Sequence, residues 1–323
     1  MKIFLIILLS ALIAACGGGS SSNDNDGVVP PVTGVEQAKF SLGLSDAPVD
    51  DAIAVVLEID TVKIIKLNDA GDSSEEILVE EFAMEDGSTA TSVVTNLLDY
   101  QGADQKKIIE ELAGIVLDEG NYQLELVIID AGSYVELDND ATLYAIKIPS
   151  SRLRLGEFAV DASLQQVGDT PAYTIEFDLR TSLVQRGNNP AQNGFILKPH
   201  GVKVVGSSGT IAGTVSSENL NLGTCTVYMY PGDATEFGDL FDSEDEAFEG
   251  EVPTATAPLA STVVTTEGTF EFGFVSAGDY MEALRCDDLV DDNIQFDGLV
   301  IPSPEGQSKF ITVTSGNTSE ANF

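Results

Sequence analysis

The strongest constraint on the fold is an alternation of apolar and polar residues with a period of two. Between residues 39 and 205 most apolar residues recur at every second position, and clusters of turn-forming residues separate the runs. The clearest runs span 122–128, 152–155 and 174–179. Successive side chains of a strand point to opposite faces, so this pattern is typical of half-buried antiparallel strands. We therefore expect a β-sandwich over this part of the chain.

One stretch has a helical period instead. Ile108, Ile109 and Leu112 lie at helical spacing behind Asp104, a residue suited to cap a helix. The sequence therefore predicts one short helix over residues 104–112.

A domain boundary is expected where glycine and serine cluster at residues 206–209. Beyond it Phe270, Phe272 and Phe274 alternate with Glu271 and Gly273, as a core-facing strand requires. A chain of 323 residues also favours two domains. We predict an all-β chain with two β-sandwich domains of Ig-like or prealbumin-like type, over residues 38–206 and 207–323.

Three separated motifs occur in the first predicted domain: LGLSDAPVDDA at 42–52, GNY at 120–122 and FDLRTS at 177–182. Together they resemble the domain-of-unknown-function 4382 family over residues 38–206. The resemblance implies a bacterial lipoprotein and no particular activity. For Asp46, Asp50 and Asp51 we favour a turn stiffened by Pro48 over a role in ligand contact.

The second predicted domain contains VYMY at 227–230, TEGTFEF at 266–272 and AGDY at 277–280. These motifs resemble the carboxypeptidase-regulatory or Cna-B type of small β-sandwich, over residues 207–323. The chain departs from that pattern between Pro231 and Pro258, where nine acidic residues crowd a long insertion.

The N-terminus indicates export. Residues 1–15 hold one lysine and an apolar stretch that is shorter than the roughly 20 residues of a spanning helix, so they are predicted to be a cleaved signal peptide. The ending IAAC at 13–16 resembles a bacterial lipobox, which implies a diacylglycerol on Cys16 and anchoring in membrane lipid. Gly17, in place of an aspartate, favours the outer membrane, on its periplasmic or external face. Residues 16–37 are predicted to be a flexible tether.

The charge balance excludes one class of partner. With 15 basic and 53 acidic residues the net charge is -38, which repels nucleic acid. Solubility in salty water is the simplest explanation of the acidity. Calcium is the only cofactor we consider, because oxygen-rich clusters suit it. Its candidate ligands are Asp287, Asp288, Asp291, Asp292 and Asp297, with a solvated acidic loop as the alternative.

Two cysteines remain once Cys16 is assigned to the lipid. Cys225 and Cys286 are expected to form a disulfide in an oxidising compartment, and the alternation places both sulfurs in one core. Glu282 interrupts the apolar face that holds Cys286, so we expect a bulge or an edge position there.

The motifs of common enzymes are absent from the sequence. The single histidine, His200, has no serine nucleophile motif to serve, and phosphate-loop, dinucleotide and zinc patterns are missing. No catalytic residue is therefore predicted. We expect a non-enzymatic, membrane-anchored lipoprotein that acts as a binding, adhesion or envelope-structural module for a protein or polysaccharide ligand.

The alternative is a carbohydrate-binding lipoprotein associated with polysaccharide use. Tyr228 and Tyr230 lie on the strand face opposite Cys225 and could stack a sugar ring, although the chain has no tryptophan. A contact between the two domains is the favoured role for this pair.

Overall fold

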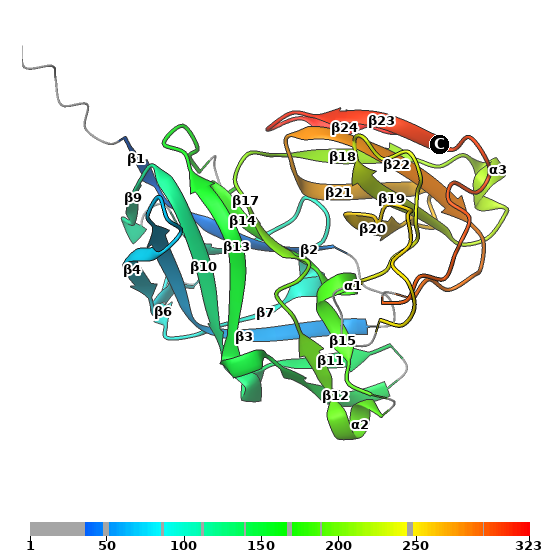
Figure 1. Ribbon diagram of the computed structural model, residues 1–323. Coiled ribbons are helices and arrows are strands. Elements are labelled where there is room, and N and C mark those ends of the chain that lie inside the picture. Colours follow the sequence, from blue (N-terminus) through cyan, green and yellow to red (C-terminus); the bar gives the residue numbers. More distant parts are fainter. Residues whose placement is uncertain are drawn as a thin grey trace, which may run out of the picture. The chain divides into compact units, whose positions relative to one another are not determined.

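The computed structural model describes residues 36–323, apart from 48–51, 85–86, 111–112, 139, 167–169, 188, 244–247 and 293. Cys16, residues 16–35 of the predicted tether, Asp50 and Asp51 lie outside the described residues, whereas Gln37, the last residue of that tether, begins strand β1 (Gln37–Lys39). Residues Val35–Phe323 form one compact unit, whose regular secondary structure consists mostly of strands (Figure 1). In this described part no helix is long and apolar enough to cross a membrane.

The first half is organised around a nine-stranded sheet. Its strands are β3 (Ala52–Leu67), β4 (Ser73–Val79), β7 (Val93–Asn96), β10 (Gly120–Ile128), β11 (Tyr134–Leu137), β12 (Asp140–Lys147), β13 (Arg152–Val160), β15 (Leu183–Gln185) and β16 (Phe195–Leu197). Their order is β13-β10-β3-β11-β12-β16-β15, with β4 and β7 also paired to β3.

A second sheet of the first half has the order β17-β14-β2-β8. Its strands are β2 (Leu42–Ala47), β8 (Lys106–Ile109), β14 (Tyr173–Asp178) and β17 (Val202–Val205). Two small pairs complete the strands: β1 (Gln37–Lys39) with β9 (Val116–Asp118), and β5 (Phe82–Ala83) with β6 (Thr89–Ala90). The helices are short: α1 (Leu179–Ser182), α2 (Pro190–Asn193), α3 (Ser217–Leu220), and 3-10 turns at Leu97–Asp99, Asp130–Gly132 and Pro149–Ser151.

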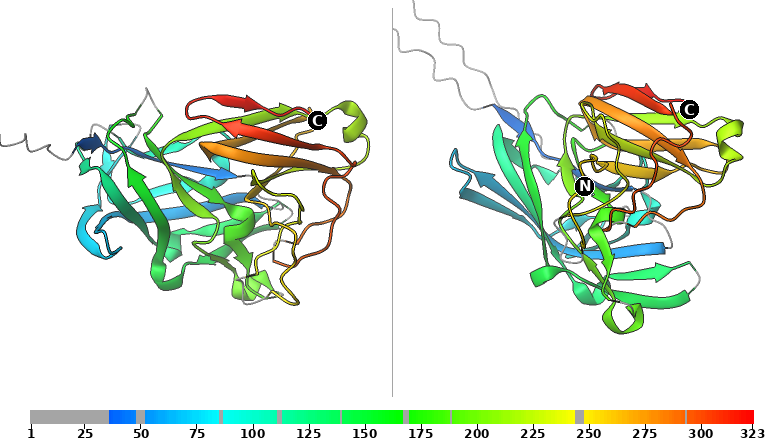
Figure 2. Two further views of the ribbon diagram at one scale, coloured as in Figure 1. Left: turned by 45° about the horizontal axis from the view of Figure 1, so that its top comes forward. Right: turned by 45° about the vertical axis from the view of Figure 1, so that its right-hand side comes forward.

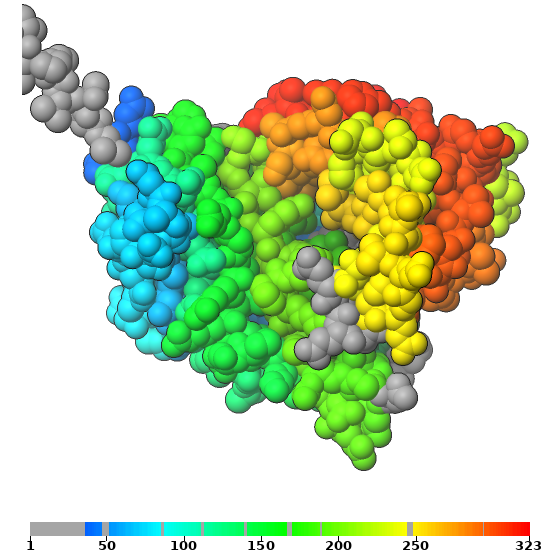
Figure 3. Space-filling model, in the orientation of Figure 1, coloured from blue at the N-terminus to red at the C-terminus, as the bar shows by residue number. Residues whose placement is uncertain are grey.

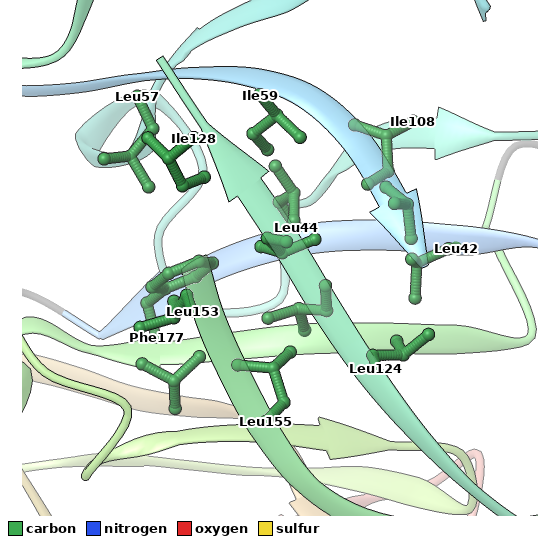
Figure 4. Packing of buried hydrophobic residues seen from close by; sticks show 14 of the residues in the cluster. Leu42, Leu44, Leu57, Ile59, Ile108, Leu124, Ile128, Leu153, Leu155 and Phe177 are labelled. Carbon is green, nitrogen blue, oxygen red and sulfur yellow. The ribbon is translucent and has the colours of Figure 1, made fainter. Parts of the chain in front are cut away.

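The predicted alternation is confirmed in the core of the first half. Leu44 of β2 and Phe177 of β14 come from the four-stranded sheet, and they pack in one cluster with Leu124 of β10 and Leu153 of β13 (Figure 4). All four side chains have no exposed surface. Each buried leucine or phenylalanine contributes about 1.5–3 kcal/mol, so the alternating strands supply the main stabilisation.

The predicted helix over residues 104–112 is wrong. Lys106–Ile109 form strand β8, which pairs antiparallel with β2 and places Ile109 opposite Leu42. An isolated helix of this length is marginal, whereas pairing with β2 satisfies the backbone at once. Glu111 and Leu112 lie outside the described residues.

The second half contains two facing sheets (Figure 2). One is β21-β18-β24, made of β18 (Ser208–Thr214), β21 (Thr269–Ser276) and β24 (Thr318–Glu320). The other is β20-β19-β22-β23, made of β19 (Cys225–Pro231), β20 (Ala260–Val263), β22 (Gly278–Cys286) and β23 (Ser308–Val313). Ile211, Val227 and Phe270 are among the buried residues that join the two sheets.

The hydrophobic cores separate near the glycine-serine cluster. The core of the first half draws on residues between Ala38 and Val202, and that of the second half on residues between Ile211 and Ala321. A further small cluster packs around Tyr228 and Tyr230 on the outer face of β19. The protein is thus an all-β chain with two sandwich cores inside one compact unit.

Candidate functional site

A pocket of about 330 Å³ lies beside strand β19. Its floor and walls come from β19 and β20, from the loop after β22, and from α1 of the first half. The lining residues are Arg180, Thr224, Thr226, Tyr228, Leu240, Val263, Arg285, Asp287, Asp288, Leu289, Val290 and Asp291. Several residues predicted for metal or sugar binding therefore lie around the same pocket.

One wall is fixed by Arg285, which is almost completely buried. Its Nε donates to Oδ2 of Asp287 at 2.9 Å, and its Nη2 donates to the other oxygen of the same carboxylate. Nη2 also donates to the carbonyl of Leu289 at 2.8 Å, and Nη1 to the hydroxyl of Tyr228 at 3.3 Å. Such a two-pronged arginine–carboxylate pair is rigid, so it holds the loop 287–289 in place.

Asp291 closes the pocket on another side. The hydroxyl of Tyr228 donates to Oδ2 of Asp291 at 2.7 Å, and the backbone N–H of Leu240 donates to Oδ1 at 3.2 Å. Burial raises the pKa of Asp291 to about 6, and the hydrogen bond from Tyr228 opposes that rise. Burial, together with the charge of Asp291, also raises the pKa of Tyr228, so its hydroxyl remains a donor.

The first half contributes Arg180, carried by α1. Asp178 caps this helix, because its Oδ1 accepts from the backbone N–H groups of Arg180 and Thr181. Nη1 of Arg180 reaches across to Oγ of Ser261 on β20, at 2.7 Å. Arg180 is 5% exposed, so this bridge between the halves is shielded from water.

The five candidate calcium ligands do not converge. Asp287 pairs with Arg285, Asp291 with Tyr228, and Asp288 accepts from the backbone N–H of Thr224. Asp292 and Asp297 hold their own loop, since Oδ2 of Asp297 accepts from the N–H of Asp292. Within the described ranges no group of three or more histidine, cysteine, aspartate or glutamate side chains is arranged to hold a metal.

The two tyrosines do not form an exposed platform. Tyr228 is 1% exposed and Tyr230 is fully buried, with ring centroids 6.5 Å apart. They pack with Leu240, Ala283 and Ile301, and Tyr230 donates to the carbonyl of Gly238 at 2.7 Å. The acidic insertion covers the rings, so neither an exposed sugar platform nor a contact between the two domains describes them.

The space-filling view shows how this cover is built. The yellow segment around residue 250 lies against the orange-red segment around residue 290 (Figure 3). A hydrogen bond joins the two segments, because the backbone N–H of Glu249 donates to Oε1 of Gln295 at 2.9 Å. The described part of the insertion is therefore packed onto the domain.

The predicted disulfide is confirmed. Cys225 of β19 and Cys286 of β22 are directly opposite in the antiparallel ladder, with Cα atoms 4.0 Å apart and a bond between the sulfurs. Both belong to the core between the two sheets.

Glu282 is neither at an edge nor in a bulge. It lies in the central strand β22, opposite Met229 on one side and Lys309 on the other, with no exposed surface. The register of the ladder is unbroken there, because the pairing uses backbone groups and one acidic side chain at an apolar position of the pattern does not alter it.

Sequence reasoning did not find Arg180, Thr224, Thr226 or Arg285 as pocket residues. The only available signal was the position of Arg180 inside the motif FDLRTS at 177–182. His200 lies exposed in a turn at the end of the first half and is not among the residues that line the pocket.

A family model described as "Domain of unknown function (DUF4382)" matches residues 37–199. No curated protein sequence matches the chain.

The similar solved structures have little sequence in common with this chain. One is the minor pilin GBS52 of Streptococcus agalactiae, at 10% identity, covering 88% of this chain and 94% of that chain, with a TM-score of 0.21. Another is the shaft pilin SpaA of Lactobacillus rhamnosus GG, at 9% identity, covering 89% of this chain and 97% of that chain, with a TM-score of 0.22. A putative cell adhesion protein from Bacteroides eggerthii is similar at 10% identity, covering 88% of this chain and 98% of that one, with a TM-score of 0.18. TM-scores this low establish no shared arrangement.

Proposed function

Because the chain belongs to the DUF4382 family, whose description assigns no activity, we propose its function from the pocket and the N-terminal sequence. The protein is a lipid-anchored component of the outer membrane that works by binding a ligand, in an adhesion or envelope-structural role, and performs no covalent chemistry.

The observation that carries this proposal is the closed hydrogen-bond network of the pocket wall. Arg285 is held by Asp287, and Asp291 is held by Tyr228. Groups that are fixed in this way present their donors and acceptors in one geometry. Rigid polar groups beside an apolar lip are typical of a binding site, because little entropy is lost when a ligand docks.

The chemistry of the lining favours a neutral, polyhydroxylated ligand such as a sugar unit. The pocket offers guanidinium, carboxylate and threonine hydroxyl groups side by side, and these pair with vicinal hydroxyls. Leu289 and Val290 are 65% and 87% exposed and provide an apolar surface for the C–H face of a ring. From Ser207 onward 21 acidic and 2 basic residues give a charge of -19, which disfavours anions. Carbohydrate binding is therefore the second, more specific candidate.

Pocket substitutions should weaken binding to polysaccharide. Thr226→Val removes a hydroxyl from the wall and keeps the strand, and Asp288→Asn removes a rim charge. Each should lower affinity about tenfold, the value of one lost hydrogen bond or two. Pull-down on a panel of neutral polysaccharides measures this.

Matched controls are Thr318→Val on β24 and Asp69→Asn in the turn after β3, both exposed and outside the pocket lining. Unchanged binding by the pocket variants, or equal loss by the controls, would remove the pocket from the proposal. Capture of a protein instead of a glycan would favour the adhesion role. If the protein turns over a glycan, and substitution of a single carboxylate residue abolishes that turnover, the proposal that the protein is not an enzyme is wrong.

The anchor has its own test. Radiolabelled palmitate should label the wild type and not a Cys16→Ser variant, because the lipobox cysteine is the acceptor of the lipid. Several buried acyl methylenes at about 0.8 kcal/mol each then keep the wild type with the membrane fraction. Equal labelling of both proteins would show that the anchor is elsewhere or absent.

A further inference from the structure

A group of buried carboxyl side chains lies where the two halves meet, away from the pocket. Asp46 of β2, Glu176 and Asp178 of β14 face a small cavity of about 20 Å³. Met229, Ala260, Glu271 and Gly273 line the same cavity from the second half. We name the three carboxyl groups of the first half the joint carboxyls.

The joint carboxyls are poorly compensated. Asp46 has no exposed surface, and neither of its oxygens makes a hydrogen bond of normal geometry with any described group; the same holds for Oε2 of Glu176. Ionised carboxylates without partners are costly in such a place. Asp178 differs, because it caps α1.

Few opposite charges surround them. Lys203 of β17 lines the cavity, and Arg180 of α1 interacts with Asp178. Glu271 of β21 adds a further carboxylate, which accepts from the backbone N–H of Ala103 at 2.7 Å. Met229, Ala260, Phe272 and Val275 contribute no charge. Two cations therefore face four carboxyl groups.

The halves approach each other closely at this point. A Cβ atom placed on Gly273 would overlap the backbone carbonyl of Gly102. The cavity of about 20 Å³ has room for about one water molecule, which is too little to hydrate several carboxylates while the two backbones stay in contact.

We propose that the joint carboxyls form a proton-dependent latch, which keeps the two halves together when Asp46 and Glu176 are neutral and loosens them when both are charged. Burial raises the pKa of Glu176 to about 8, against the opposing charge of Lys203. Burial and the charges of Glu176 and Asp178 raise the pKa of Asp46. The neutral forms are thus favoured in the closed joint, and rising pH through about 8 opens it.

The latch also affects the position of Arg180, because Asp178 caps the helix that carries it. Its consequence for ligand binding rests on the proposed function, but the latch itself does not.

Hydrogen–deuterium exchange of the full chain without its signal peptide, at pH 6 and pH 9 and corrected for intrinsic rates, tests the latch. In the wild type, peptides from β2, β14, β20 and β21 should exchange at least about tenfold faster at pH 9, since the pKa of Glu176 is raised by more than one unit and each unit corresponds to a factor of ten. An Asp46→Asn/Glu176→Gln variant should show less than about a twofold change, because its joint cannot ionise.

Two further variants keep the result interpretable. Glu176→Gln alone should show an intermediate response if the double variant folds poorly. Gly273→Ala should expose the same peptides at both pH values, because its Cβ separates the halves. The latch is overturned if the double variant responds to pH like the wild type, or if β10, deep in the first core, opens together with the joint peptides.

Discussion

Replacing Glu282 by glutamine should raise the melting temperature of the protein at pH 9 and leave it nearly unchanged at pH 5. Glu282 is fully buried in the central strand β22, and neither of its oxygens has a hydrogen-bond partner among the described residues. Burial raises its pKa from 4.5 to about 8. Glutamine has the shape of the protonated acid and cannot ionise.

The direction with pH follows from linkage. The folded-state pKa lies above the unfolded value, so the contribution of Glu282 is intact below pH 4.5 and is lost as the pH rises to about 8. The shift is about 3.5 pKa units, so at 1.36 kcal/mol per unit the loss above pH 8 is on the order of 5 kcal/mol. Denaturant unfolding of wild type and variant between pH 5 and pH 9 measures it.

Glu218→Gln is the matched control, because Glu218 is exposed on α3. The two curves of the Glu282→Gln and wild-type proteins should converge below pH 5, while the control should follow the wild type throughout. Parallel curves at all pH values would show that Glu282 remains ionised in the fold and that its burial has been misjudged.

Removing the disulfide should destabilise the protein by about 4 kcal/mol, the value that the chain-entropy model gives for closing a loop of this length. The bond joins Cys225 to Cys286, which are 61 residues apart and belong to paired central strands. Dithiothreitol should therefore lower the denaturation midpoint of the wild type. A Cys225→Ala/Cys286→Ala variant should begin at that lower midpoint and no longer respond to the reductant. If the midpoint is unchanged on reduction, the disulfide does not contribute to stability, and the ladder hydrogen bonds and the surrounding core stabilise this part of the fold without it.

The alternation of side chains predicted strands where burial of one face decides them, whereas β8 was expected to be helical. Leu153 and Leu155 are buried between exposed Arg152 and Arg154, as the pattern required. The rule fails where both faces are covered. All six residues of β14 are buried, including Glu176, which the alternation assigned to solvent. The second half covers that face, and no local pattern carries this information.

The candidate site was less predictable for the same reason. Sequence placed Tyr228 correctly on the face opposite Cys225, but its burial depends on an insertion that folds back over it. Arg180 reaches the pocket only because α1 lies beside β20. Phe274 was predicted on the core-facing side of its strand together with Phe270 and Phe272. Its backbone takes a φ of 47°, and Val275 joins the core between the two sheets in its place.

We propose that the pocket binds a ligand without converting it. The most direct test is hydrogen–deuterium exchange of the protein in the presence of a fragment of a polysaccharide that the pull-down retained. The fragment should protect peptides covering residues 224–228 and 285–291, and mass spectrometry should recover it intact. Protection confined to other parts of the chain, or recovery of a cleaved fragment, would contradict the claim.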